Sequence, residues 1–174
     1  MERELADNLE TLHPDAFGWA LHCCGGDYSR AEEVLQNAYL KVAQGCASRL
    51  GSSTLKTWWF GVIRLTALEE FRRQRYRESL LGKLWLHLSG DNQDPRPSPA
   101  HQAELDEQTL QLRVAIDQLP DRQAEVLHLV FYQDLSLSEA ALVMKVSLGS
   151  ARQHYERGKA RLRSLLQTHS DNET

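Results

Sequence analysis

Residues 119–166, LPDRQAEVLHLVFYQDLSLSEAALVMKVSLGSARQHYERGKARLRSLL, contain two helix starts separated by a short turn. Ser136 and Glu139 have the spacing of a capping box, in which each side chain bonds the backbone N–H of the other residue. Residues 147–150, SLGS, supply a tight turn and a second helix N-cap. This order predicts a short helix, 137–144, then a longer basic helix, 148–167, as in a helix-turn-helix.

Two more helices are predicted before this pair, at 103–117 and 121–133. Pro120 favours the start of the second, because proline fits the first turn of a helix. The four helices form a C-terminal unit, 103–168. The polar tail after Leu166 is expected to be frayed.

An N-terminal unit, 7–88, shows the same helical periodicity. One helix ends at Gly45 and has apolar residues at helical spacing: Ala31, Val34, Leu35, Ala38, Tyr39 and Val42. A second helix is predicted from Thr54 to about Arg77, with Ser53 or Thr54 as its N-cap.

A polar segment, 89–102, separates the two units and contains Pro95, Pro97 and Pro99. Such a segment cannot bury enough apolar surface to fold, so it is predicted to be a linker. The sequence shows no hairpin dipeptide and no series of short strands. We therefore expect an all-α protein: two small helical domains joined by a Pro-rich linker, the C-terminal one a helix-turn-helix.

Positive charge is concentrated in two blocks, although the net charge of the chain is -4. Counting Asp, Glu, Lys and Arg gives +4 for residues 51–88 and +5 for residues 145–163, with a block of -7 between them. The position of positive charge, rather than its total, indicates where a protein binds nucleic acid. The overall acidity therefore does not exclude DNA binding.

The predicted last helix contains residue types that contact duplex DNA. Its N-terminal part would enter the major groove, where arginine, glutamine and histidine can bond base edges, while later lysines and arginines neutralise phosphates. We expect four of its residues to pack inward: Ala151, Tyr155, Ala160 and Leu162. A solvated basic helix face is the alternative interpretation.

The other basic block, from Lys56 to Arg77, is interleaved with Trp58, Trp59 and Phe60. Aromatic rings beside cationic groups suit single-stranded nucleic acid, because bases stack on rings while the cations follow the phosphates. Aromatic residues at helical spacing are also typical of a core, and at least one of Trp58 and Trp59 is expected to be buried.

Residues 119–166 resemble the C-terminal promoter-recognition domain of extracytoplasmic-function RNA polymerase sigma factors. Residues 31–36, AEEVLQ, resemble the acidic polymerase-binding helix of that family, and LKTWWF at 55–60 through FRR at 71–73 resembles its promoter-opening segment. The two matches occur in the family's order, with a linker between them.

The resemblance implies that the chain is an alternative sigma factor with three sets of functional residues. Binding of the polymerase beta-prime clamp helices is implied for Glu32, Glu33, Leu35, Gln36 and Asn37. Capture and opening of the minus-10 element is implied for Lys56, Trp58, Trp59, Arg64, Arg72 and Arg73. Recognition of the minus-35 element is implied for Ser150, Arg152, Gln153, His154, Arg157, Lys159 and Arg161. Core RNA polymerase, including its beta flap, and promoter DNA are the implied partners, and an anti-sigma factor is a possible one.

Four residues depart from the family pattern. Arg30 and Asn37 stand where acids are usual, which makes the polymerase-binding helix less negative. Leu65 replaces a polar asparagine in the promoter-opening segment. Lys145 stands at a turn position that normally carries glycine, and a left-handed lysine there would cost up to about 1 kcal/mol relative to glycine.

Two alternatives stay open. A sigma mimic would keep the fold but act by binding an anti-sigma factor. The less acidic polymerase-binding helix and Leu65 favour this alternative, whereas the basic residues retained in the last helix disfavour it. An ordinary helix-turn-helix repressor or activator would leave the N-terminal unit without a role.

Enzymatic activity and cofactors are not expected. Cys23, Cys24 and Cys46 include an adjacent pair and lack metal-ligand spacing, so core positions are favoured over a metal or redox site. The acidic start of the sequence does not resemble a signal peptide, and no apolar run is long enough to cross a bilayer. A cytoplasmic location without membrane insertion is expected.

Overall fold

The computed structural model describes residues 2–47, 53–85, 114–116 and 118–171. These residues form helices and turns, with no strand among them, which confirms the all-α prediction. The longer helices are α1 (Glu2–Thr11), α2 (His13–Cys23), α3 (Tyr28–Ala43), α4 (Leu55–Trp85), α6 (Asp121–Phe131), α7 (Leu137–Met144) and α8 (Leu148–Asp171).

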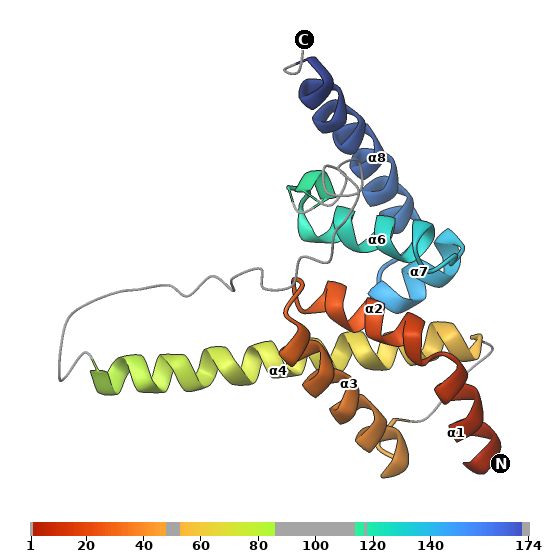
Figure 1. Ribbon diagram of the computed structural model, residues 1–174, viewed down its shortest axis with the longest axis vertical. Coiled ribbons are helices and arrows are strands. Elements are labelled where there is room, and N and C mark those ends of the chain that lie inside the picture. Colours follow the sequence, from red (N-terminus) through yellow and green to blue (C-terminus); the bar gives the residue numbers. More distant parts are fainter. Residues whose placement is uncertain (1, 48–52, 86–113, 117, 172–174) are drawn as a thin grey trace.

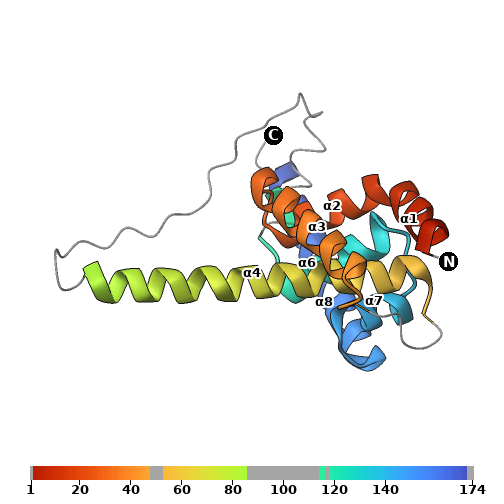
Figure 2. The same cartoon turned by 90° about the horizontal axis from the view of Figure 1, so that it is seen from below.

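The N-terminal unit consists of α1 to α4, with α4 as its central helix. Both α2 and α3 pack along the first half of α4, and the second half extends away from the other helices (Figures 1 and 2). Trp19 of α2 is fully buried, and its indole N–H donates to the backbone oxygen of Phe60 at 3.0 Å. At the end of α3, Gly45 has a φ of 71°, a conformation that glycine adopts without a steric penalty.

The C-terminal unit is the predicted helix-turn-helix. The capping box at the start of α7 is present: Ser136 Oγ accepts from the N–H of Glu139 at 3.3 Å, and Glu139 Oε2 accepts from the N–H of Ser136 at 3.0 Å. Ser147 Oγ accepts from the N–H of Ser150 at 3.1 Å in the first turn of α8. Because these short-range bonds form where the sequence places them, the starts of both helices match the prediction.

One hydrophobic core runs through both units. Trp19 and Phe60 of the N-terminal unit belong to the same buried cluster as Val126 and Leu129 of α6 and Met144 of α7. A smaller cluster, with Leu119, Ala124 and Leu127, lies between α6 and α8. The two units are therefore packed against each other over α2, α4, α6 and α7 (Figure 1).

Several helix boundaries differ from the prediction. The N-terminal unit begins with α1, whose Leu9 joins the core, rather than near residue 7. At its other end, α4 continues to Trp85, because residues 78–85, ESLLGKLW, consist mostly of good helix formers. The helix predicted to end at 133 ends at Phe131, and the one predicted to end at 167 continues to Asp171, so the tail is helical beyond Leu166.

The linker 89–102 and most of the helix predicted at 103–117 lie outside the described residues; Val114–Ile116 of that helix are helical. None of the helices in the described part of the chain has the length and apolar character needed to cross a membrane.

Candidate nucleic-acid and polymerase interfaces

One side of α8 packs on α6, and this contact decides which residues of α8 face outward. Ala151 and Gly158 are buried, with Tyr155 and Leu162 half-buried on the same side. A Cβ at Gly158 would lie 3.1 Å from Leu127 Cδ1, so glycine permits the close approach of the two helices. Ala160, which we expected to pack inward, is exposed, because it lies on the far side of the helix from Gly158.

The residues predicted to contact the minus-35 element lie on the outward side of α8. Arg152, Gln153, Arg157 and Arg161 are exposed, whereas Ser150, His154 and Lys159 are partly buried. At about 100° per residue, Gln153 lies near the middle of the exposed side, with Arg157 on one flank and Arg152 on the other.

The two flanks of α8 offer different chemistry. Lys159 shares the Arg152 flank, where it contacts Glu156 at 3.7 Å and lies over the Tyr155 ring at 4.8 Å. On the other flank, Ser150, His154, Arg157 and Arg161 follow one another at helical spacing. Donors on both flanks could contact both walls of a DNA groove at once.

The predicted minus-10 residues do not form one surface. Trp59 and Arg64 are buried, Lys56 and Trp58 are partly buried, and Arg72 and Arg73 are exposed. The burial of Trp59 confirms that one of the adjacent tryptophans is a core residue. Stacking of a base on Trp59 is not possible in this arrangement.

Lys56 and Arg64 are already engaged with carboxylates. Lys56 Nζ contacts Asp15 Oδ2 at 2.8 Å and lies over the Phe60 ring at 5.5 Å. Arg64 Nε is ion-paired with Glu125 Oε1 of α6, and both side chains are largely shielded from water.

The open stripe of α4 contains Trp58, Leu65, Arg72 and Tyr76, which recur at helical spacing. Tyr76 is 67% exposed and lies among exposed arginines, although we did not single it out from the sequence. Its position in the basic block was the only available signal. Leu65, the departure from the family's asparagine, is half-buried on this stripe.

The predicted polymerase-binding residues divide between two sides of α3. Glu32, Leu35 and Gln36 line a groove of about 430 Å³ between α2 and α3, together with Leu40, which is 49% exposed. Glu33 lines a separate pocket of about 340 Å³ between α3 and α4. The groove combines an apolar floor with acidic and amide groups at its edge.

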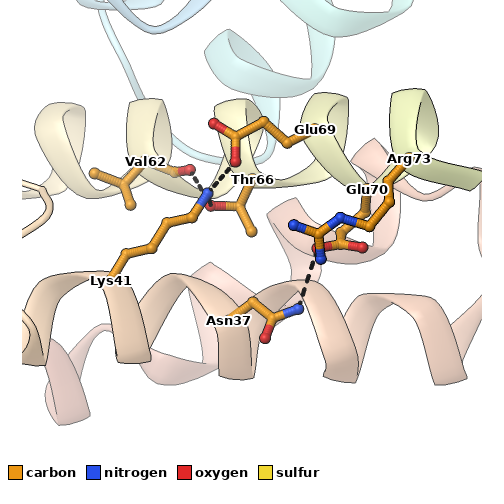
Figure 3. A network of polar contacts seen from close by, with 7 residues as sticks. All are labelled: Asn37, Lys41, Val62, Thr66, Glu69, Glu70 and Arg73. Atoms are coloured by element: carbon orange, nitrogen blue, oxygen red, sulfur yellow. Dashed lines mark hydrogen bonds and ion pairs between the residues drawn. The ribbon is translucent and has the colours of Figure 1, made fainter.

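Asn37 faces α4 rather than either pocket. Its Nδ2 donates to Glu70 Oε1 at 3.4 Å, and Glu70 also contacts Arg73 Nη1 at 3.4 Å (Figure 3). A carboxylate in place of Asn37 would point at Glu70 and be repelled. The departure at this position therefore has a local structural reason, which is the acidic side chain on α4.

Lys41 forms the neighbouring link between α3 and α4. Its Nζ bonds Thr66 Oγ1 at 3.2 Å and Glu69 Oε2 at 2.5 Å, and Thr66 Oγ1 donates to the Val62 oxygen at 2.9 Å (Figure 3). Asn37 and Lys41 therefore lie on the side of α3 that contacts α4, whereas Gln36 and Leu40 line the groove.

Arg30 and Lys145 are two other residues that depart from the family pattern. The structure shows the side-chain contacts of Arg30 and the backbone conformation of Lys145. Arg30 Nε lies 3.2 Å from Asp27 Oδ2 at the start of α3, and its guanidinium lies 5.9 Å from the centre of the Phe71 ring. Lys145 ends α7 in the left-handed region, with φ 55° and ψ 48°, so the cost relative to glycine that the sequence raised as a condition applies at this turn.

The three cysteines occupy different environments. Cys24 is buried, and burial raises the pKa of its thiol to about 12; burial also raises the pKa of the partly buried Cys23. Cys46 is exposed, contrary to the core position expected for it, because it follows the turn at Gly45. In the described ranges, no group of three or more His, Cys, Asp or Glu residues is placed to hold a metal ion.

Comparison with known proteins identifies both units. Residues 9–77 match the family model of Sigma-70 region 2, and residues 115–164 match that of Sigma-70, region 4. The chain is 28% identical over 171 residues to the ECF RNA polymerase sigma factor SigX of Bacillus subtilis (strain 168), covering 96% of this chain and 86% of SigX. It is 25% identical over 163 residues to the ECF RNA polymerase sigma factor EcfG of Rhodopseudomonas palustris (strain TIE-1), covering 93% of this chain and 84% of EcfG.

A solved structure has a similar fold. It is the sigma factor RpoE in complex with the anti-sigma factor NepR from Bartonella quintana, with a TM-score of 0.68, 20% identity, and coverage of 95% of this chain and 98% of that chain. The two family models match in this order along an all-helical chain, and the relatives that match most of its length are also sigma factors. The chain belongs to the sigma-70 family as an extracytoplasmic-function RNA polymerase sigma factor, an alternative sigma factor that directs transcription initiation.

Proposed function

We propose that this sigma factor binds core RNA polymerase through the groove between α2 and α3, and promoter DNA through α4 and α8. The groove is the observation that carries the polymerase assignment, because Glu32, Leu35 and Gln36 line it beside the exposed Leu40. Apolar side chains rimmed by polar ones are typical of protein interfaces. The beta-prime clamp helices are the proposed occupant, and the beta flap is the proposed partner of the C-terminal unit.

Recognition of the minus-35 element is assigned to the outward side of α8. Arg152, Gln153 and Arg157 are exposed in the first turns of the second helix of a helix-turn-helix, the part that enters the major groove. Ser150 and His154 of the set are partly buried beside these residues, and Lys159 and Arg161, further along α8, are assigned to phosphate contacts.

Opening of the minus-10 element is assigned to α4. Arg72 and Arg73 are exposed for phosphates, and Trp58 offers a partly exposed ring for a base. Holding an unstacked base is energetically feasible, since unstacking costs a few kcal/mol and stacking on protein recovers part of that cost.

These roles require no covalent chemistry, so the protein is proposed to act without enzymatic activity or a cofactor. It would act where core polymerase and the chromosome are, in the cytoplasm. An anti-sigma partner is a further proposal, supported by the similar fold of RpoE in its complex with NepR.

A matched pair of variants tests the polymerase interface. Gln36→Arg places a long cation at the groove, whereas Asn8→Arg makes the same change of charge at an exposed position of α1 that does not line the groove. Because a central interface residue typically contributes a large share of the binding energy, we expect Gln36→Arg to weaken core binding at least about tenfold. Asn8→Arg should bind core polymerase as the wild type does. Equal affinities for the two variants would contradict the assignment of the groove.

A further inference from the structure

The first two turns of α8 present one large apolar side chain among polar ones. Leu148, the first residue of the helix, is 44% exposed. The accessible residues around it have hydroxyl, guanidinium, amide or imidazole groups, or no side chain at Gly149, whereas Ala151 is buried. Among residues 147–154, all of which the structure describes, Leu148 is therefore the one apolar side chain available to a partner.

Short-range bonds hold the start of α8, and with it Leu148, in a defined position. The Ser147 hydroxyl accepts from the N–H of Ser150 at 3.1 Å, and the Ser147 carbonyl accepts from the N–H of Ala151 at 2.9 Å. One residue earlier, the N–H of Val146 donates to the backbone oxygen of Ala141 in α7 at 3.0 Å. Because the backbone is already ordered, a contact made by Leu148 costs little additional conformational entropy.

Leu148 lies beside a residue assigned to base contacts. Arg152 follows it by four positions, and residues with this spacing are neighbours on one side of a helix. The surface next to Leu148 is open, since a Cβ at Gly149 would meet only the Ser147 hydroxyl, at 3.8 Å, apart from the two adjacent residues. A base edge that reaches Arg152 can therefore also reach Leu148.

The major groove offers a leucine side chain one kind of complement. The base edges there present hydrogen-bond donors and acceptors, and the C5 methyl of thymine is their distinctive apolar group. Contact between leucine and this methyl removes apolar surface from water, which is favourable. Contact with a G·C pair would instead cover polar groups without bonding them, which is unfavourable. An exposed leucine at this position therefore favours an A·T pair with a defined orientation.

We infer that Leu148 determines specificity within the minus-35 element by contacting the methyl group of one thymine. This inference rests on the proposed binding of α8 in the major groove. Four residues of helix rise about 6 Å, close to two base-pair steps of about 3.4 Å each. The thymine therefore lies within two base pairs of the one that Arg152 contacts.

Removal of the methyl group tests the inference on the DNA. Duplexes are selected from a random-sequence pool by the wild-type full-length chain, and each thymine of the selected site is replaced in turn by deoxyuridine, which lacks only the C5 methyl. Fluorescence anisotropy then gives the Kd of each duplex. We expect one replacement to weaken binding about fourfold, which equals about 0.8 kcal/mol, the contribution of one buried methylene group.

Two leucine variants test the inference on the protein. Leu148→Ala should bind the thymine and deoxyuridine duplexes equally well, because the apolar partner of the methyl is gone. Leu142→Ala, which changes a leucine of α7 that is 60% exposed, should keep the fourfold preference for thymine. Arg152→Ala should also keep it, while losing the base preference at its own position, and this second loss locates the pair that Arg152 contacts.

Three results would overturn the inference. They are a selected site with no thymine within two base pairs of the Arg152 position, a wild-type affinity that no deoxyuridine replacement changes, and a preference for thymine that Leu148→Ala retains. Selected duplexes that share no sequence would contradict the proposed function of α8 itself. That failure is distinguishable, because it appears before any thymine is replaced.

Discussion

Replacing glycine with alanine is expected to have opposite effects on the free energy of unfolding at two positions, Gly158 and Gly61. Gly158 lies in α8 against α6, where an added Cβ would be 3.1 Å from Leu127 Cδ1, 3.2 Å from Gln123 Cβ and 3.3 Å from Leu127 Cγ. At Gly61, in α4, an added Cβ would meet nothing within 4 Å. Both positions gain the helix propensity of alanine, about 0.8–1.0 kcal/mol over glycine.

The steric cost at Gly158 exceeds that gain. Gln123 Cβ is fixed to the backbone of α6, and Leu127 is 2% exposed, so neither can retreat without shifting a helix. Overpacking of this kind costs about 1–3 kcal/mol. We therefore expect Gly158→Ala to lower the free energy of unfolding by about 0–2 kcal/mol and Gly61→Ala to raise it by about 0.5–1 kcal/mol.

Urea unfolding followed by far-UV circular dichroism measures both values on the full-length chain. The α6–α8 contact also orients the DNA-binding side of α8, so Gly158→Ala should weaken duplex binding, whereas Gly61→Ala should not change it. A Gly158→Ala protein at least as stable as Gly61→Ala would refute the close approach of α6 and α8.

Three other predictions concern α8, the turn before it and the histidines between the units. Arg152→Ala should weaken binding to duplexes selected from a random-sequence pool by about 1–3 kcal/mol and relax their sequence preference; an equal loss on all sequences would assign Arg152 to phosphate. Lys145→Gly should raise the free energy of unfolding by about 0.5–1 kcal/mol, and with it the midpoint of urea unfolding, because Lys145 has a left-handed backbone. A lower midpoint would argue against that conformation. Burial, with a contribution from His22, lowers the pKa of His128 from its ordinary 6.5 to about 3, so the unfolded chain binds the additional proton below pH 6.5. Stability should therefore fall as pH decreases from 6.5 towards 3, and urea midpoints at pH 7.5 and 5.5 should differ less for His128→Gln than for the wild type; equal differences would show that His128 is not the group involved.

Local signals predicted the helix-turn-helix well. The capping box of Ser136 and Glu139 and the N-cap of Ser147 depend on residues three positions apart, so their spacing is visible in the sequence. The glycine at 45 likewise marked the end of α3 through its own backbone preference. Where a helix start or stop depends on neighbouring residues, the sequence was sufficient.

Contacts between distant residues were not predictable in the same way. Arg64 and Glu125 are separated by 61 positions, and nothing near either residue indicates their pairing. Trp58 and Trp59 are adjacent and chemically alike, and only the packing of α4 makes Trp59 the buried one. The sequence therefore identified the residues assigned to the minus-10 element by their aromatic or basic side chains. Which of these side chains are accessible depends on the tertiary structure.

Asn37 illustrates how a structural partner changes the meaning of a departure. From the sequence, a missing acid on α3 suggested weaker polymerase binding. In the structure, Asn37 bonds Glu70 of α4, while Gln36 and Leu40 face the groove. The loss of charge at residue 37 thus adjusts the contact between two helices and leaves the groove residues in place.

Run-off transcription tests the central claim most directly. Core RNA polymerase would be incubated with genomic DNA fragments, with and without the full-length protein, and the transcripts mapped to their start sites. The account predicts transcripts from a discrete set of start sites that share sequence elements near minus-10 and minus-35 and appear only when the protein is present. Identical transcripts with and without the protein, together with no binding to core polymerase, would contradict it.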